Sequence, residues 1–182
     1  MLSPAEDETK NFLASLFEQG EKLGAHPLDE VKGMILNWSD PMEKTEWAQS
    51  TSKAGTDALE LMRGRIRAMR ALGNYGRVSM ALHFGFLQSE YPGLKAVLDS
   101  PKDLTAADRK ELRRLCAYLA YDMNSLDTFP FGSGFHLGNP NMSEMAVEAR
   151  VKAALLVKDH PMFKAWGEWN LAFLKDLLRR FC

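Results

Sequence analysis

The sequence predicts an all-α fold built from stacked antiparallel helix pairs. Apolar residues recur at spacings of three and four along most of the chain, which is the period of an amphipathic helix. No stretch alternates apolar and polar residues for long enough to form a convincing strand. The chain has 182 residues, 46% of them hydrophobic, which is enough for one domain with a sizeable core.

The first two helices are expected near the amino terminus. Ser3 and Glu6 have the spacing of a capping box, and Pro4 occupies the first helical position. A shorter apolar stripe predicts a second helix, which the residues Ser39-Asp40-Pro41 would end. The stripes that predict these helices are Phe12, Leu13, Leu16, Phe17 and Leu23, and then Leu28, Val31, Ile35 and Trp38.

Three further helices are expected in the middle of the chain. The third covers residues 51–72, and the fourth runs from Arg77 to about Glu90, where Tyr91-Pro92-Gly93 is expected to break it. A capping-box spacing at Thr105 and Asp108 begins the fifth. Its predicted buried face is Leu112, Leu115, Cys116, Leu119 and Met123, and that of the third helix is Ala58, Met62, Ile66 and Met69.

The last two helices are expected to form an αα-hairpin. One begins at Ser143 and reaches about Val157, and a short turn over residues 158–161 leads into the other. The final helix carries an apolar stripe of Phe163, Trp166, Phe173, Leu174, Leu177 and Phe181.

Charge and cysteine usage exclude several classes of protein. With 23 Lys and Arg against 24 Asp and Glu, the formal net charge is −1, which argues against a nucleic-acid partner. No apolar run approaches the ~18–20 residues that cross a bilayer, so no membrane insertion is expected. Cys116 and Cys182 form neither a metal-binding pair nor a disulfide framework. No His or carboxylate spacing suggests a metal site, and nothing indicates a cofactor.

The one long segment without helical periodicity is residues 124–142, NSLDTFPFGSGFHLGNPNM, which we call the connector. Loops longer than about 12–15 residues in compact domains are usually functional or disordered. The aromatic residues of the connector, such as Phe135, favour order, and its glycines allow the backbone to approach a ligand. It presents His136, Asn139 and Asn141 just before a helix amino terminus, where free N–H groups favour anions.

A purely structural interpretation of the same residues stays open. Asn and Ser favour turns and helix caps, so residues 139–143 are equally typical of a plain turn before a helix. Tyr121, three residues before the connector begins, has two interpretations as well. It could contact a ligand in a cleft beside the connector, or pack as an aromatic residue on the helix face.

The connector and the helices around it resemble part of the heparinase II/III-like polysaccharide lyases. The resemblance is carried by residues 134–142, GFHLGNPNM, followed by a helix, the turn KDHP and a helix that contains Trp166. It implies an (α/α) toroid, here incomplete, followed in that family by β-sandwich domains that this chain lacks. It also implies an enzyme that cleaves uronic-acid-containing polysaccharide by β-elimination, and thus an acidic polysaccharide as the partner.

The resemblance assigns roles to connector residues. Asn141 corresponds to the family's Asn at the sugar cleft, which would neutralise the uronate carboxylate, and His136 would be the second catalytic group. Met142 stands where the family has a His, so that role is either lost or taken by His136. Asn139, Phe135 and Tyr121 would contact the substrate.

The resemblance also bears on the chain as a whole. We expect residues 1–182 to be a single helical domain and a fragment of a larger toroid, because the chain stops in helical register and about seven helices are counted where a closed toroid needs twelve. The acidic amino terminus is not a signal peptide, although the resemblance implies a periplasmic or secreted protein. The rival interpretation is a non-catalytic helical scaffold that binds a glycan or a protein.

Overall fold

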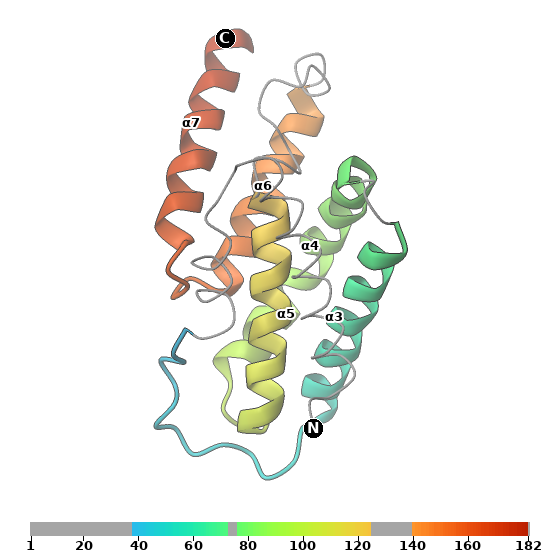
Figure 1. Cartoon of the computed structure of the whole chain (residues 1–182), viewed down its shortest axis with the longest axis vertical. Helices are drawn as coiled ribbons and strands as arrows, with labels where there is room; N and C mark the ends of the chain where they lie inside the picture. Colours follow the sequence, from blue (N-terminus) through green and yellow to red (C-terminus); the bar gives the residue numbers. More distant parts are fainter. Residues whose placement is uncertain (1–37, 73–75, 125–139, 182) are drawn as a thin grey trace.

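The computed structural model describes residues 38–72, 76–124 and 140–181, and within them the chain forms five helices and no strand (Figure 1). The predicted all-α class is therefore confirmed for this part of the chain. The first two expected helices lie outside the described residues, apart from the end of the second. The helices are α3 (Lys53–Leu72), α4 (Gly76–Asp99), α5 (Ala106–Asn124), α6 (Pro140–Leu156) and α7 (Phe163–Phe181).

Helix α5 is the centre of the structure. It packs against α3, α4 and α6, and nearly every described side chain from Glu111 to Asn124 is buried. The five positions predicted for its apolar face are all buried, and so are the intervening Ala117 and Ala120. A helix that is buried on all sides needs apolar residues beyond one stripe, which explains why the α5 sequence contains more of them than a surface helix does.

Helix α6 packs against α4, α5 and α7 through small side chains. Its buried positions Ala146, Ala149 and Ala153 recur at helical spacing. Small residues at a helix contact allow the axes to approach closely, toward the short end of the usual 8–10 Å range. Residues 157–162 then turn the chain, and α7 runs back alongside α6 (Figure 1).

The expected break at Tyr91-Pro92-Gly93 is wrong, because α4 continues through Pro92 to Asp99. Proline inside a helix costs ~3 kcal/mol through a lost hydrogen bond and a steric clash. After Pro92, however, the helix buries Leu94, Val97 and Leu98 in the core, and each such side chain contributes about 1.5–3 kcal/mol. The burial outweighs the penalty, and Pro92 itself lies on the exposed side.

The other helix boundaries fall near the predicted ones. Helix α3 begins at Lys53, two residues after the expected start, and α6 begins at Pro140, three residues before Ser143. Proline is favoured at the first position of a helix, so the start at Pro140 has a local cause. The predicted buried face of α3 is confirmed at Ala58, Met62 and Ile66.

The amino terminus of α5 has the predicted capping box. The Thr105 hydroxyl accepts a hydrogen bond from the Asp108 backbone N–H at 3.1 Å and donates one to the Asp108 carboxylate at 2.6 Å. The same carboxylate accepts a hydrogen bond from the Thr51 hydroxyl, so the cap also holds the residues that precede α3. One carboxylate thus links the starts of two neighbouring helices.

Residues 38–52 form no helix and run along the base of the helical core. The Ala48 N–H donates to the Pro101 carbonyl at 3.0 Å, and the Ser52 N–H donates to the Asp103 carbonyl at 2.9 Å. At Gly55 the helix approaches this carbonyl so closely that an added Cβ would lie 2.1 Å from it. A side chain at position 55 would therefore push α3 away from the α4–α5 turn.

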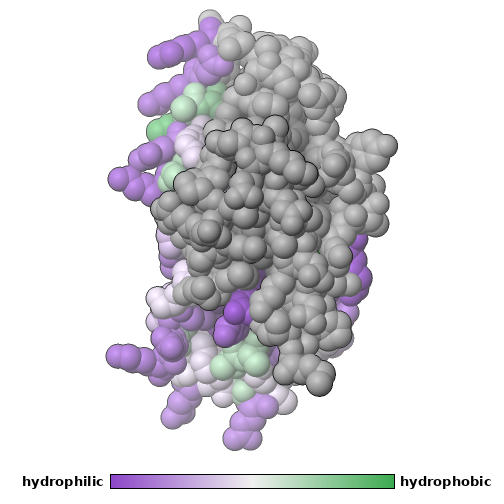
Figure 2. Space-filling model, in the orientation of Figure 1, coloured by the Kyte–Doolittle hydropathy of each residue, from purple (hydrophilic) through white to green (hydrophobic). Residues whose placement is uncertain are grey.

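Where described residues are visible in Figure 2, most of them are hydrophilic. Figure 2 also shows hydrophobic atoms among the hydrophilic ones along α7, which carries Leu171 and Leu178, each 52% exposed. None of the helices described here is both long and apolar enough to span a bilayer.

Removal of the α5 cap tests how far this local signal stabilises the fold. The variant Thr105→Ala should lower the free energy of unfolding by ~1 kcal/mol, because the Asp108 N–H loses its acceptor. Urea unfolding followed by circular dichroism measures the change. Thr45→Ala is the control, since the Thr45 side chain has no hydrogen bond among the described residues and should cost under about 0.5 kcal/mol. Equal effects of the two substitutions would contradict the capping role.

Candidate functional site

The structure describes only part of the site predicted from the sequence. Phe135, His136 and Asn139 lie outside the described residues, and their predicted roles stay predictions. Asn141 lies in the first turn of α6, and its side chain is also outside the description. Free backbone N–H groups are found in that turn of any helix.

Tyr121 lies on α5, one turn before the helix ends at Asn124, and is 6% exposed. It belongs to the buried cluster of the core. This burial favours the packing role over the ligand contact, and a substrate contact at Tyr121 stays a prediction.

A buried polar network joins the end of α5, where the connector begins, to α6 and α7. We call it the asparagine network, and its members are Asn124, Arg150 and Asn170. The Asn124 amide nitrogen donates to the carbonyls of Ala120 and Arg150, at 2.8 and 3.2 Å. Its amide oxygen accepts a hydrogen bond from the Asn170 amide nitrogen at 2.8 Å. Because these residues belong to α5, α6 and α7, the network fixes the three helices relative to one another where the connector begins.

Arg150 contributes the charge of this network. It is 2% exposed, and its Nε donates to the carbonyl of Met123 at 2.8 Å. Burial lowers the pKa of Arg150 to about 10, since the charged form loses its hydration. The Arg150 guanidinium thus bonds to the last turn of α5 from its position on α6.

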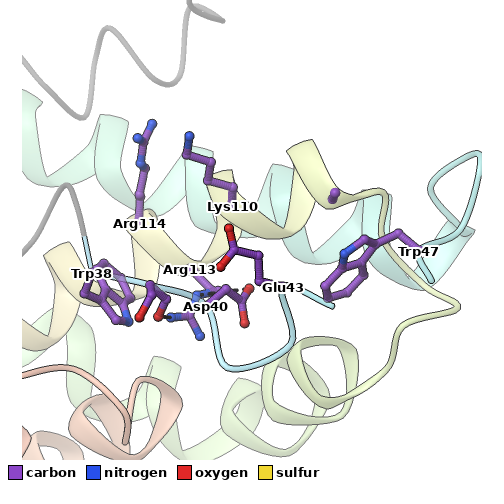
Figure 3. Close-up of a pocket in the computed structure, with 9 residues that line it drawn as sticks. Trp38, Asp40, Glu43, Trp47, Lys110, Arg113 and Arg114 are labelled. Carbon is purple, nitrogen blue, oxygen red and sulfur yellow. Dashed lines mark hydrogen bonds and ion pairs between the residues drawn. The ribbon is translucent and has the colours of Figure 1, made fainter. Parts of the chain in front are cut away.

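A second candidate site, which we call the base pocket, lies between residues 38–47 and the first half of α5 (Figure 3). Its volume is about 530 Å³, within the range of ~300–1,000 Å³ that is usual for small-molecule sites. In Figure 3, Trp38 and Trp47 lie at opposite ends, and charged side chains occupy the space between them. The lining residues are Trp38, Ser39, Asp40, Glu43, Trp47, Ala106, Lys110, Arg113 and Arg114.

Asp40 holds the pocket wall against α5. Its carboxylate accepts hydrogen bonds from Arg109 at 2.7 and 3.1 Å, and it forms an ion pair with Arg113 at 3.4 Å. Partial burial acts to raise the pKa of Asp40, but hydrogen bonds from Arg109 and the Met42 N–H, with the charges of both arginines, outweigh it and hold that pKa below 3.8. Asp40 is therefore ionised at neutral pH.

Asp159, in the turn before α7, supplies the second carboxylate. Arg113 donates to it at 2.6 and 3.3 Å, and the Trp38 indole donates to it at 2.8 Å. Burial again acts to raise the pKa of Asp159, yet the hydrogen bond and charge of Arg113 and the bond from Trp38 lower it overall. Because Arg113 joins Asp40 to Asp159, α5 connects the pocket wall to the α6–α7 turn.

Trp38 is held by a cation–π contact and a ring contact, as well as by its hydrogen bond to Asp159. The Arg113 guanidinium lies 4.7 Å from the centre of its ring, and His160 contacts it edge-on at 4.8 Å. His160 is itself buried and stacks on Trp166 of α7 at 5.0 Å. At the other end of the pocket, the Arg109 guanidinium lies 5.1 Å from the ring of Trp47. Both indoles are therefore held before any ligand arrives.

Two charged side chains of the pocket differ from the paired arginines and Asp40, because they are exposed and have no partner among the described residues. Lys110 and Glu43 are both exposed, and neither has a hydrogen bond or ion pair among the described residues. In Figure 3 the Glu43 carboxylate extends from residues 38–47 toward the same region of α5 that carries Lys110. The pocket thus offers one cation and one carboxylate whose bonding capacity is available to a ligand.

The sequence interpretation missed the base pocket. It assigned Trp38 and Asp40 to the end of a helix, and it placed His160 only as a turn residue. One signal was present: Arg109 and Arg113 lie four residues apart and so share a face of α5. Nothing in the sequence indicated that Asp40 would meet that face.

No protein-family model, curated protein or solved structure matches this chain. In the described residues, no group of His, Cys, Asp and Glu is placed to hold a metal ion. Cys116 is buried, and burial raises the pKa of its thiol to about 12, so it is not a nucleophile at neutral pH.

The asparagine network should be important for stability. The variant Asn124→Ala should lower the free energy of unfolding by about 2–3 kcal/mol, because it removes three buried hydrogen bonds of the Asn124 amide. Urea unfolding measures the change. Asn170→Ala should cost less, because Asn124 then loses one partner and keeps two. A loss below about 0.5 kcal/mol in Asn124→Ala would contradict the role of the network.

The carboxylates of the base pocket should make stability depend on pH. Because the folded-state pKa values of Asp40 and Asp159 lie below 3.8, their contribution is complete above that pH and is lost as the pH falls through the folded-state values. The double variant Asp40→Asn/Asp159→Asn should therefore lose less stability than the unchanged chain on acidification from neutral pH to about pH 2.

Urea unfolding at a series of pH values measures this dependence. The matched control is Asp57→Asn/Asp99→Asn, in which two exposed carboxylates of helix-surface ion pairs are removed. This control should follow the pH dependence of the unchanged chain. A double pocket variant with the same acid sensitivity as the unchanged chain would show that the two carboxylates do not stabilise the fold.

Proposed function

We propose that this chain is part of a protein that cleaves uronic-acid-containing polysaccharide by β-elimination. Asn141 would neutralise the uronate carboxylate, His136 would be the second catalytic group, and Asn139, Phe135 and Tyr121 would contact the sugar. The observation that carries the proposal is the asparagine network, which fixes the last residue of α5, where the connector begins, to α6 and α7. A loop that presents catalytic groups needs such a fixed frame.

The chemistry explains the choice of residues. A base removes the proton at C5 of the uronate, the C5 electrons form a double bond to C4, and the bond from C4 to the leaving oxygen breaks. That oxygen receives a proton, so no water is consumed. The developing charge lies beside an existing carboxylate, and the N–H donors of Asn141 would stabilise it there. His136 would move the proton.

The proposed architecture is an incomplete (α/α) toroid of antiparallel hairpins. The all-helical fold and the return of α7 alongside α6 support it. In this architecture the connector would face the sugar cleft.

A second candidate function is a non-catalytic helical module that binds a glycan. The base pocket favours it, because two indoles with charged groups between them are a binding surface that needs no catalytic group. Only the lyase would form a product from a bound acidic polysaccharide, whereas the module would bind it unchanged.

Binding of a uronate oligosaccharide tests the role of Asn141. The substitution Asn141→Ala should weaken binding roughly tenfold or more, because a hydrogen bond to a charged group contributes about 1.5–3 kcal/mol. Titration calorimetry measures the affinity. The same oligosaccharide with its carboxylates reduced to alcohols is the control ligand, and its affinity should be the same for both proteins. An equal loss for both ligands would show that Asn141 does not recognise the carboxylate.

The elimination reaction separates the two functions. Unsaturated uronate products absorb in the ultraviolet, and their formation from an acidic polysaccharide would support the lyase. Asn141→Ala should lower that rate by about 10²–10³, as removal of a donor to a developing oxyanion does. When the whole protein of which this chain is a part is assayed, binding without product formation would favour the non-catalytic module and contradict the lyase.

A further inference from the structure

The base pocket lies far from the connector, and the proposed elimination chemistry does not use it. Lys110 is near the start of α5 and Asn124 is its last residue. At 1.5 Å per residue, the two ends are separated by about 20 Å along the helix. A ligand in the base pocket would therefore be bound independently of one at Asn141.

We infer that the base pocket is a second binding site, for a saccharide unit that carries one anionic group. Three features of the pocket select this ligand: the two fixed indoles, the available cation of Lys110 and the available carboxylate of Glu43.

The indoles select a ligand with flat apolar faces. Trp38 and Trp47 lie at opposite ends of the pocket and each contacts an arginine guanidinium, so neither ring must be ordered when a ligand binds (Figure 3). Rigid aromatic surfaces contribute contact area at low entropic cost. The C–H faces of a pyranose ring match such surfaces, and the volume of about 530 Å³ leaves room for more than one ring.

The charged groups select the polar chemistry. A carboxylate only accepts hydrogen bonds and an ammonium only donates them, so Glu43 and Lys110 together require a ligand with both donors and an acceptor. Sugar hydroxyls donate to Glu43, and a carboxylate or sulfate of the ligand accepts from Lys110. The other carboxylate of the lining, Asp40, is already paired with Arg109 and Arg113 and serves to fix the wall.

The charges that a ligand would meet limit it to a small anion. Asp40 is paired with Arg109 and Arg113, and Asp159 is paired with Arg113, so Lys110 is the cation and Glu43 the carboxylate that a ligand would contact. A doubly charged phosphate of a nucleotide would be repelled by Glu43. A single uronate or sulfate group is balanced by Lys110 alone.

Titration of the full chain with two matched disaccharides tests the inference. Cellobiuronic acid and cellobiose differ in one carboxylate, and cellobiose 6-sulfate distinguishes sulfate from carboxylate. We expect cellobiuronic acid or the sulfate to bind about tenfold more tightly than cellobiose, which is the contribution of one charge-assisted hydrogen bond. The indole N–H signals of Trp38 and Trp47 in the nuclear magnetic resonance spectrum should move on binding.

Single variants connect the affinity to the pocket. Lys110→Gln should reduce the affinity for the anionic disaccharides to that for cellobiose, and Trp47→Ala should weaken all three. Lys110 is exposed, so its replacement does not threaten folding. The control Lys175→Gln removes an exposed lysine of α7 and should change nothing. Asn141→Ala should also leave this binding intact, which separates the inference from the proposed lyase site.

Four results would overturn the inference. These are equal affinity for cellobiose and the anionic disaccharides, indole signals that do not move, binding that Lys110→Gln leaves unchanged, and tighter binding of adenosine monophosphate than of any disaccharide. The first result would show that the site does not recognise an anionic group. The next two would show that the ligand does not bind in the base pocket, and the last would show that the ligand is a nucleotide and not a saccharide.

Discussion

The paired arginines of α5 and the carboxylates that they meet are the constraint on which the described structure depends. Arg109 and Arg113 are 4% and 6% exposed, and each would be costly to bury alone. Asp40 reaches them from the non-helical residues 38–52, and Asp159 reaches Arg113 from the α6–α7 turn. These ion pairs therefore connect three parts of the chain that are distant in sequence. Removing one partner of such a pair costs about 3–5 kcal/mol, because a buried charge is left behind.

The same helix places two candidate sites at its two ends. Near the amino-terminal end of α5, ion pairs with Arg109 and Arg113 fix the walls of the base pocket. At the carboxy-terminal end, Asn124 belongs to the asparagine network, which holds the helix where the connector begins. The two ends use different chemistry. At the base, buried arginines pair with partly exposed carboxylates. At the other end, the amides of Asn124 and Asn170 bond to each other and to main-chain carbonyls, and the Arg150 guanidinium bonds to a main-chain carbonyl.

Local patterns in the sequence predicted the helices. Contacts between residues that are distant in sequence could not be predicted from such patterns. Thr105 and Asp108 gave the start of α5 because a capping box depends only on residues within one turn. The break expected at Pro92 was wrong because the deciding factor was burial of Leu94 and Val97 against other helices. The base pocket was missed for the same reason: Asp40 and Arg109 are 69 residues apart in sequence, and no local pattern shows that they meet. The connector was identified as a candidate site from its composition, and the roles of His136, Asn139 and Asn141 stay predictions.

In this account, both functions attributed to the chain depend on α5 as a rigid support whose ion pairs hold residues 38–52 in place. Native-state hydrogen exchange tests this claim most directly in the variant Arg109→Gln. The account predicts that the amides of Met42 and Ala48, which bond to Asp40 and Pro101, lose protection by about 10–100-fold, while the buried turns of α5 near Leu119 keep theirs. Unchanged protection at Met42 and Ala48 would show that residues 38–52 are held by something other than the arginines, and would contradict the account.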